Sequence, residues 1–385
     1  MPRPSLHRTS THDGAKRHEN SYAVLVNRIR LAAPGLGQEE ATEVARVLAS
    51  GMLVQGREVE AFERSVAERC ERAHAIAVSS GTAALELALR ALGISDGEVL
   101  VPDLTWPSPA HATALVGAIP VLVDVDEREW NPRPESFANA RSNSTKAAIV
   151  IDQFGVPARH REIAAALEGV SIIEDAACAI GSLLEGRPCG SLGVVSCLSF
   201  HPRKVITTGE GGMCLTDDAS LAAELRMWRN HGQRTPGQFV TAAVNVRLTE
   251  MQAAMGRVQL GRLDSLIEAR RRLADRYREK LPRELSTQEA PDGAFRNEQT
   301  FGVLLPPETS REAVIEALAR AEIESGRLSY ALHVLPSLHM ARRASALETS
   351  SSIVERGIAL PLHGGMSLAD VDRVASQLVA AIEGI

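Results

Sequence analysis

The most informative run of this chain is Ser199-Phe-His-Pro-Arg-Lys204, which is followed closely by the glycine-rich run Gly209-Glu-Gly-Gly212. The apolar residues from Val194 to Phe200 have the length and composition of a buried strand. Lys204 therefore lies between a strand and a turn, and a solvated surface charge explains it poorly. Because a lysine amine can form a Schiff base, the position favours a covalent anchor for a cofactor. Taken alone, the stretch also fits a plain lysine at a strand end, with glycines that only form the turn.

A second motif, Ser171-Ile-Ile-Glu-Asp-Ala-Ala177, is a short apolar run that ends in two carboxylates. This pattern is typical of a buried parallel strand whose carboxyl end delivers a functional group, here Asp175. Pyridoxal phosphate needs a carboxylate against its ring nitrogen, because the protonated ring is what accepts electrons from the substrate. An aspartate after a strand is by itself more typical of a helix cap or a turn. Its pairing with Lys204 favours the cofactor role.

A third motif, Ala75-Ile-Ala-Val-Ser-Ser-Gly-Thr-Ala-Ala-Leu85, predicts a strand, a tight turn and a helix that continues to Leu92. The free N–H groups and the dipole of a helix start form a natural cradle for phosphate. Gly81 allows close approach there, and the Thr82 hydroxyl adds a hydrogen bond. By itself the motif also fits an ordinary capped helix after a strand.

Together these motifs resemble the pyridoxal-phosphate aminotransferases of fold type I, and specifically the DegT/DnrJ/EryC1/StrS family of sugar and cyclitol aminotransferases. The resemblance runs from about Arg28 to the C-terminus, and its most specific part is Ser199–Gly212. The supporting matches are Ser80–Leu85, Val101–Trp106, Glu174–Ala177 and Asn245–Gly256 with Gln259-Leu260. The resemblance implies an α/β fold, with a mostly parallel sheet in a large domain and a smaller C-terminal α/β domain.

The same resemblance implies pyridoxal 5′-phosphate as the cofactor and assigns roles to individual residues. Lys204 is implied as the Schiff-base lysine and later proton carrier, Asp175 as the partner of the pyridine nitrogen, and Trp106 as the ring stacked on the cofactor. The phosphate-binding residues that it implies are Gly81, Thr82 and Ser199. In relatives the asparagine that matches Asn245 reaches the phosphate from the neighbouring subunit. A homodimer with shared active sites is therefore implied.

The sequence departs from the family pattern at two places. Relatives usually carry Gln or His where this chain has Cys178, and a thiol is a weaker donor for the cofactor's ring oxygen. Relatives often place a glycine at Ala243-Val244, so this loop is expected to follow a different path. Dehydratases of the family replace the anchoring lysine by histidine, and Lys204 argues against that branch.

The implied reaction is a two-stage transamination with glutamate or glutamine as the amino donor. The implied acceptor is a nucleotide-linked keto-sugar or a keto-cyclitol, in the biosynthesis of an amino sugar or of an aminocyclitol antibiotic; the Thr105-Trp106 pair is similar to that of cyclitol-type members. The candidate acceptor contacts are Gln153, Arg247, Tyr330 and His333. His333 alone fits a structural role better than a functional one, and Gln153 fits a plain strand-end residue about equally well.

Three other functions remain open at this stage. One is another reaction on the same scaffold, such as a dehydratase or an aromatising synthase. The second is a catalytically silent regulatory or binding relative, which an intact Lys204 and Asp175 disfavour. The third is a nucleotide-phosphate site at Gly209–Gly212, but a P-loop needs its lysine after the glycines, and here the lysine precedes them.

The order of predicted elements indicates two domains. Strand-like runs alternate with helical stretches from Ala75 to Glu174, which predicts a mostly parallel sheet covered on both faces, with ligands outside the carboxyl ends of its strands. Downstream, Leu248 to Leu281 predicts one long helix or a broken pair, and Arg296 to Pro306 predicts a strand. We expect a mobile tail over residues 1–21, a large cofactor-binding domain over 22–260 and a small C-terminal domain over 261–385.

The composition sets limits on partners and on cellular location. A formal net charge of −6 gives no electrostatic footprint for nucleic acid. The five cysteines are an odd number without a CxxC pair, which predicts free thiols in a cytoplasmic protein and no metal site. The N-terminal residues lack an apolar stretch long enough for a signal peptide or a membrane span, so no membrane partner is expected.

Overall fold

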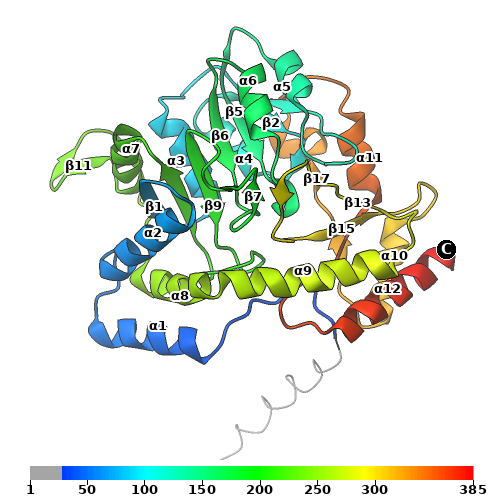
Figure 1. The fold of residues 1–385 in the computed structure, drawn as a ribbon. Coiled ribbons are helices and arrows are strands. Elements are labelled where there is room, and N and C mark those ends of the chain that lie inside the picture. The colour runs from blue at the N-terminus through cyan, green and yellow to red at the C-terminus, as the bar shows by residue number, and fades with distance from the viewer. Residues whose placement is uncertain (1–27, 385) are drawn as a thin grey trace, which may run out of the picture.

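The computed structural model describes residues 28–384, and its main feature is an eight-stranded sheet with the order β1-β10-β9-β6-β5-β2-β4-β18 (Figure 1). The strands are β1 (His74–Val78), β2 (Glu98–Pro102), β4 (Ile119–Val123), β5 (Thr145–Ile151), β6 (Ser171–Asp175), β9 (Val195–Ser199), β10 (Gly212–Thr216) and β18 (Arg342–Arg343). Strand β10 pairs antiparallel with both its neighbours, and all other pairs are parallel. The predicted mostly parallel sheet is confirmed, and the predicted tail over residues 1–21 lies outside the described residues.

Helices cover both faces of this sheet, because the strand side chains alternate between two apolar cores. In β1, Ile76 and Val78 pack against one helix layer while Ala75 and Ala77 pack against the other. The first layer consists of α3 (Gly81–Ala91), α4 (Ser108–Leu115) and α7 (Ala219–Arg229). The second consists of α2 (Arg57–Arg69), α5 (Pro134–Ala140) and α6 (His160–Ala166). Burial on both faces is what produces the continuous apolar runs of the parallel strands.

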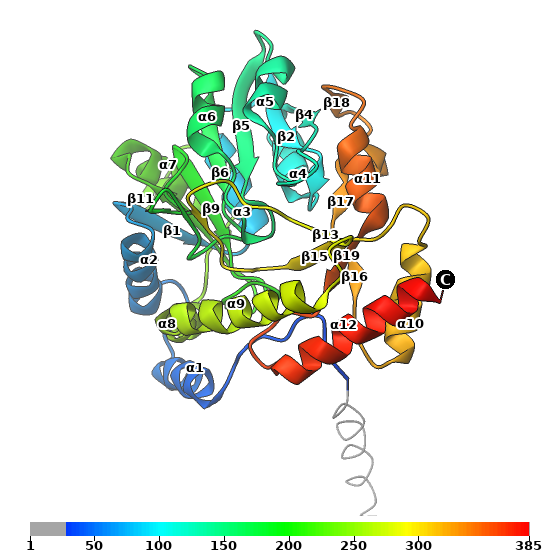
Figure 2. The same ribbon diagram turned by 45° about the vertical axis from the view of Figure 1, so that its right-hand side comes forward.

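The predicted long helix is a broken pair, α8 (Glu250–Gly261) and α9 (Leu263–Lys280). Thr249 caps α8 with a capping box that includes Gln252. Helix α8 packs against α1 (Gln38–Ser50) and α2, where Gly256 leaves no room for a side chain beside Phe62. Helix α9 continues beneath the large sheet and reaches the C-terminal part of the chain (Figures 1 and 2).

The C-terminal part contains a second, four-stranded antiparallel sheet. Its order is β13 (Ser286–Thr287), β15 (Phe301–Leu304), β19 (Gly357–Leu360) and β16 (Gly326–Arg327), and its core includes residues of α10 (Arg311–Arg320) and α12 (Leu368–Glu383). The strand predicted over Arg296 to Pro306 is wrong in part: β14 (Ala294–Phe295) and β15 are separate strands. The intervening residues 296–300 have no regular structure, because their polar groups bond to other elements instead of to a neighbouring strand.

Chain segments cross between the two parts. Ile29 forms an isolated bridge with Ile323 and is buried in the core of the second sheet. In the other direction, β18 extends the large sheet, and β17 (Tyr330–Ala331) pairs with β3 (Leu104–Thr105) next to it. Division of the chain at residues 260/261, near the end of α8, stays a prediction. These crossings show that each of the two sheets also pairs or packs with residues from the other side of that division.

Candidate active site

Several of the predicted cofactor residues gather at one edge of the large sheet. Asp175 is the last residue of β6, Ser199 is the last residue of β9, and Gly81 begins α3 just after β1. This edge holds the carboxyl ends of the parallel strands, where α/β proteins bind their ligands. The topology thus brings together three motifs that lie far apart in the sequence.

Lys204 is held in a tight turn that directs its amine into this edge. Its backbone N–H donates to the His201 carbonyl at 2.8 Å, and Val205 and Ile206 anchor the turn in the apolar core. The Lys204 side chain is half-buried, and Nζ donates to the Cys178 sulfur at 3.1 Å. The amine therefore lies beside the turn that follows Asp175, as a lysine that anchors a cofactor must.

Asp175 is a buried carboxyl with little internal hydrogen bonding. One oxygen accepts the Ala177 N–H at 3.0 Å. Burial raises the pKa of Asp175 to about 6, against the lowering effects of the Ala177 N–H and of Lys204, and Asp152 raises it further. A buried carboxyl with free acceptor capacity, next to an amine, fits the ring nitrogen of pyridoxal phosphate.

The start of α3 and the end of β9 lie directly against each other and form the candidate phosphate cradle. Ser80 caps the helix by accepting the Ala83 N–H at 3.1 Å. A side chain on Gly81 would place its Cβ only 2.9 Å from the Ser199 Cβ, so the helix start and the strand end approach as closely as a glycine allows. The Thr82 hydroxyl lies 2.6 Å from the Ser108 hydroxyl. The helix start thus offers N–H groups beside the Thr82 hydroxyl and next to Ser199, an arrangement that suits an anion.

Two amide side chains that we did not predict brace the turns carrying Lys204 and Cys178. Asn297 donates to the carbonyls of Cys178 and Ile180, each at 2.9 Å, and Gln299 donates to the Arg203 carbonyl at 2.6 Å. Both braces come from the irregular segment 296–300. No local periodicity marks these residues in the sequence, because their partners lie more than 90 positions away.

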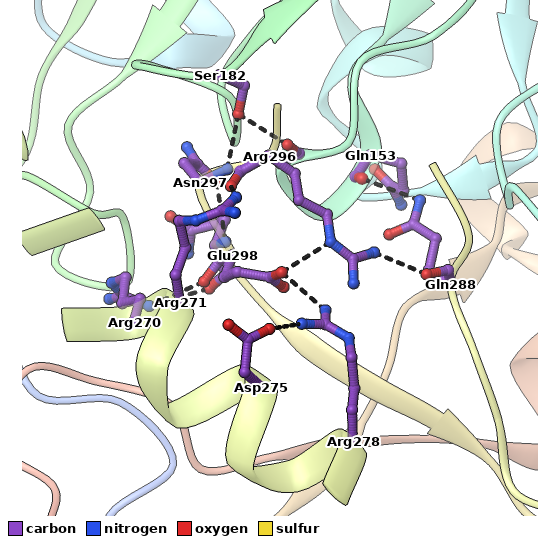
Figure 3. A network of polar contacts seen from close by, with 12 residues as sticks. Gln153, Ser182, Arg270, Arg271, Asp275, Arg278, Gln288, Arg296, Asn297 and Glu298 are labelled. Atoms are coloured by element: carbon purple, nitrogen blue, oxygen red, sulfur yellow. Dashed lines mark hydrogen bonds and ion pairs between the residues drawn. The ribbon is translucent and has the colours of Figure 1, made fainter. Parts of the chain in front are cut away.

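A polar network on α9 fixes this segment in turn (Figure 3). Arg270 is buried and donates to the carbonyls of Glu298, Gln299 and Leu362. Burial lowers the pKa of Arg270 to about 10. Glu298 accepts from Arg296 and Arg278, both at 2.7 Å. The network ties α9 to the residues behind the candidate site.

Trp106, the predicted stacking ring, lies beside two of the predicted acceptor contacts, Tyr330 and Gln153. Trp106 is 61% exposed, and its ring meets the Tyr330 ring edge-on with the centroids 5.4 Å apart. Gln153 is buried nearby and donates to the Leu104 carbonyl at 3.1 Å and to the Ser329 hydroxyl at 3.5 Å. These residues form one polar and aromatic wall, because β17 pairs with β3.

The remaining candidates are engaged elsewhere in the chain. His333 contacts the Asp103 carboxylate through Nδ1 at 2.7 Å and the Ser351 hydroxyl through Nε2 at 3.3 Å. Both ring nitrogens are therefore occupied, and acceptor binding by His333 stays a prediction that this geometry does not favour. Arg247 donates to the Asn230 side chain at 3.0 Å. Asn245 is exposed and forms an isolated backbone bridge with Asn230, so its side chain faces outward from this subunit.

Comparison with known proteins bears on the identity of this site. The family model of the DegT/DnrJ/EryC1/StrS aminotransferase family matches residues 34–379. The chain belongs to this family. GDP-perosamine synthase of Caulobacter vibrioides is 36% identical, over 91% of this chain and 97% of that protein.

Two solved structures share the whole fold. A putative sugar aminotransferase of Streptococcus pneumoniae, in its PMP form, has a TM-score of 0.89 and 25% identity, covering 93% of this chain and 98% of its own. DesV of S. venezuelae, in complex with a ketimine intermediate, has a TM-score of 0.84 and 33% identity, covering 90% of this chain and 95% of its own. The protein is a pyridoxal-phosphate-dependent aminotransferase of fold type I.

The residues of this chain fit that cofactor. Lys204 would offer the amine, Asp175 the buried carboxyl, and Gly81, Thr82 and Ser199 the phosphate cradle. When bound, pyridoxal phosphate supplies an electron sink for the substrate carbon. Across residues 28–384, no helix is both long and apolar enough to cross a membrane.

Proposed function

We propose that this protein transfers an amino group from glutamate or glutamine to a nucleotide-linked keto-sugar. The observation that carries the proposal is that the Lys204 amine, the Asp175 carboxyl and the phosphate cradle all lie at one edge of the sheet. Lys204 would hold the cofactor and, once released, would take up and return a proton at Nζ. Asp175 would hold the proton of the ring nitrogen, and Trp106 would cover the ring.

The acceptor class is supported by a cavity that is bordered by the three residues preceding Lys204. The cavity has a volume of about 460 Å³ and is lined by residues from 28–34, from His201–Arg203, from helix α10 and from 323–325. Arg28, Arg30 and Arg203 line it, and Glu324, which pairs with Arg28 at 3.1 Å, is the acidic residue in its lining. Its apolar lining includes Leu31, Pro34, Ile315 and Ile323.

A net positive rim with an apolar wall suits a nucleoside diphosphate, because the arginines can pair with phosphate while the base packs against aliphatic side chains. A keto-cyclitol without a diphosphate would leave this cavity unused. We therefore favour a nucleotide-linked keto-sugar over a keto-cyclitol. The curated relative named as GDP-perosamine synthase supports the same acceptor class.

We also propose that the enzyme works as a homodimer with shared active sites. Asn245 is exposed next to Val244, whose side chain is 63% exposed. The loop with Met52 and Val54 is exposed as well and joins this region, because the Glu250 N–H donates to the Leu53 carbonyl. A second copy of the chain would cover these apolar residues and bring Asn245 to the phosphate of its partner.

The five free cysteines, four of them buried, support a reducing cytoplasm as the place of action. Retention of Lys204, where dehydratases of the family carry histidine, supports transamination over dehydration.

The acceptor is tested by a two-step assay on the purified enzyme. L-glutamate or L-glutamine should first convert the bound cofactor to its amino form, and a panel of nucleotide-linked keto-sugars should then restore the original spectrum. R30A and R203A should raise the KM for the keto-sugar at least tenfold and leave the donor step unchanged, because each removes a phosphate-binding charge. K280A, at an exposed position on α9, is the control. Equal effects on both steps would contradict the nucleotide assignment.

Sharing of the active site is tested by mixing two inactive variants. K204A and N245D should each be inactive, but random exchange of subunits should restore about a quarter of the wild-type activity, since half of the dimers then have one intact site. No recovery, with exchange demonstrated by mass, would contradict the shared site.

A further inference from the structure

A buried ion pair lies directly behind the strand end that carries Asp175. His160 Nε2 is 2.7 Å from Asp152 Oδ1, and the two side chains are 3% and 0% exposed. The same oxygen accepts the Ala158 N–H at 2.9 Å, while Asp152 Oδ2 has no hydrogen-bond partner. Buried charges are costly unless they are paired, so this arrangement needs a reason beyond packing.

The pair is joined to the cofactor residue through the backbone. Ile151, the last residue of β5, pairs with Asp175 in the parallel register of β5 and β6. The N–H of Asp152 then donates to the Asp175 carbonyl at 3.1 Å. The carboxyls of Asp152 and Asp175 thus come from adjacent strand ends, and the charge of one acts on the other. Asp152 raises the pKa of Asp175 in addition to the larger effect of burial.

We propose that the Asp152–His160 pair is a positioning element for transamination, which balances the charge behind Asp175 so that this residue stays ionised against the cofactor ring nitrogen. The inference rests on the role proposed above for Asp175. Without His160, the bare Asp152 carboxylate would repel the ionised form of Asp175. With His160 protonated, the charge of Asp152 is offset, but only in part at Asp175, because Asp152 comes from the adjacent strand end and still raises the pKa of Asp175. Burial lowers the pKa of His160, but the Asp152 carboxylate outweighs this effect and the net shift is upward.

The surrounding ionisable groups do not replace this pair. The Glu174 carboxylate accepts the N–H groups of Gly190 and Leu192 and the Ser196 hydroxyl, at 2.7, 2.8 and 2.5 Å. Ligand atoms of Asp152, Glu174 and Cys189 lie within 4.8 Å of one another, but these three hydrogen bonds already engage Glu174, so we interpret the cluster as a hydrogen-bonded group. The other ionisable groups that face Asp175 or the pair are Lys204, Cys197, Arg187 and, through Ser196, Arg72.

The proposal predicts shifts of opposite sign for the two partners. Asp152→Asn removes the negative charge and keeps an acceptor for Ala158, so Asp175 should ionise at lower pH. His160→Gln keeps a donor for Asp152 but removes the balancing charge, so Asp175 should ionise at higher pH. A charge on the adjacent strand end should shift the pKa of Asp175 by about one unit. In the double variant the His160→Gln effect should vanish, because no Asp152 charge remains to balance.

The experiment measures the Kd for pyridoxal phosphate against pH, from 5 to 8, on the cofactor-free full chain. Affinity should fall where Asp175 becomes protonated, and comparison between variants removes the pH effects that all of them share. We expect the pH at which the affinity falls to be about one unit lower in D152N, higher by a similar amount in H160Q, and lower in the double variant. D175N is measured alongside, and circular dichroism verifies folding.

Shifts of the same sign, or no shift in either variant, would overturn the positioning role of the Asp152–His160 pair. In that case a flattened pH profile in D175N would still support the role of Asp175. An unchanged profile in D175N would instead overturn the role of Asp175 itself. If H160Q does not fold, D152N decides alone: a downward shift supports the proposal, and an unmoved profile overturns it.

Discussion

The phosphate cradle makes a quantitative prediction for Gly81→Ala. The new Cβ would stand 2.9 Å from the Ser199 Cβ and 3.3 Å from its hydroxyl oxygen. Carbon atoms in contact prefer about 3.5–4.0 Å, so the start of α3 and the end of β9 must separate by roughly 0.6–1 Å. Rotation of the Ser199 side chain cannot relieve the clash, because the contact is with Cβ.

Overpacking of this kind costs about 1–3 kcal/mol. If cofactor binding needs the native spacing, the same cost enters the binding free energy and weakens the Kd for pyridoxal phosphate about 5-fold to 150-fold. Fluorescence titration of the cofactor-free protein measures the Kd, and urea denaturation measures the free energy of unfolding.

Gly261→Ala is the matched control for this prediction. Gly261 lies in α8, and a Cβ there would meet nothing within 4 Å. Alanine should therefore be neutral or stabilise the protein by up to about 1 kcal/mol, with an unchanged Kd. If G81A bound the cofactor as tightly as G261A does, the reasoning that places phosphate between Gly81 and Ser199 would be refuted.

Three further substitutions test other parts of the account. Glu250 caps the start of α2 by accepting the N–H groups of Gly56, Glu58 and Val59 at 2.8, 3.0 and 2.9 Å. E250Q should therefore lower the free energy of unfolding by about 1–2 kcal/mol in urea melts, and an unchanged midpoint would contradict a stabilising role for this cap. The pKa of Asp175 rises from 3.8 in the unfolded chain to about 6 in the folded protein. Folding is therefore most favoured below pH 4, where the carboxyl is protonated in both states, and becomes less favourable as pH rises through 6 and the buried carboxyl ionises. The cofactor-free D175N protein should therefore be more stable than wild type at pH 8, by at most about 3 kcal/mol, and equal to it near pH 3.5; equal stability at both pH values would contradict the buried charge. D103N should weaken the link to His333 and cost about 1–3 kcal/mol of stability without changing the KM for the acceptor, whereas a raised KM would return His333 to the acceptor site.

The sequence predicted which motifs meet at this sheet edge because the pattern around each of them is local. Lys204, Asp175 and Gly81 each follow a strand-like run within a few residues, and the parallel order of the strands brings their ends to one edge. The short apolar runs also predicted the two-sided burial of the sheet.

The parts that local patterns missed depend on contacts between distant segments. Asn297 and Gln299 brace the active-site turns from a stretch that the apolar pattern predicted as strand. The pairing of Asp152 with His160 is close in sequence, but only the sheet register shows that it lies behind Asp175. In the same way, the arginines at residues 28 and 30 reach the Lys204 turn only because Ile29 packs beside Ile323.

We propose that the amine of Lys204 anchors the cofactor at this sheet edge. Borohydride reduction of the purified holoenzyme, followed by peptide mass spectrometry, can identify the anchoring residue, because reduction makes the lysine–cofactor linkage permanent. We predict that the cofactor mass is found on the peptide that contains Lys204, that K204A carries none, and that K280A behaves as wild type. A cofactor trapped on another lysine, or none trapped from an enzyme fully loaded with pyridoxal phosphate, would contradict the role of Lys204.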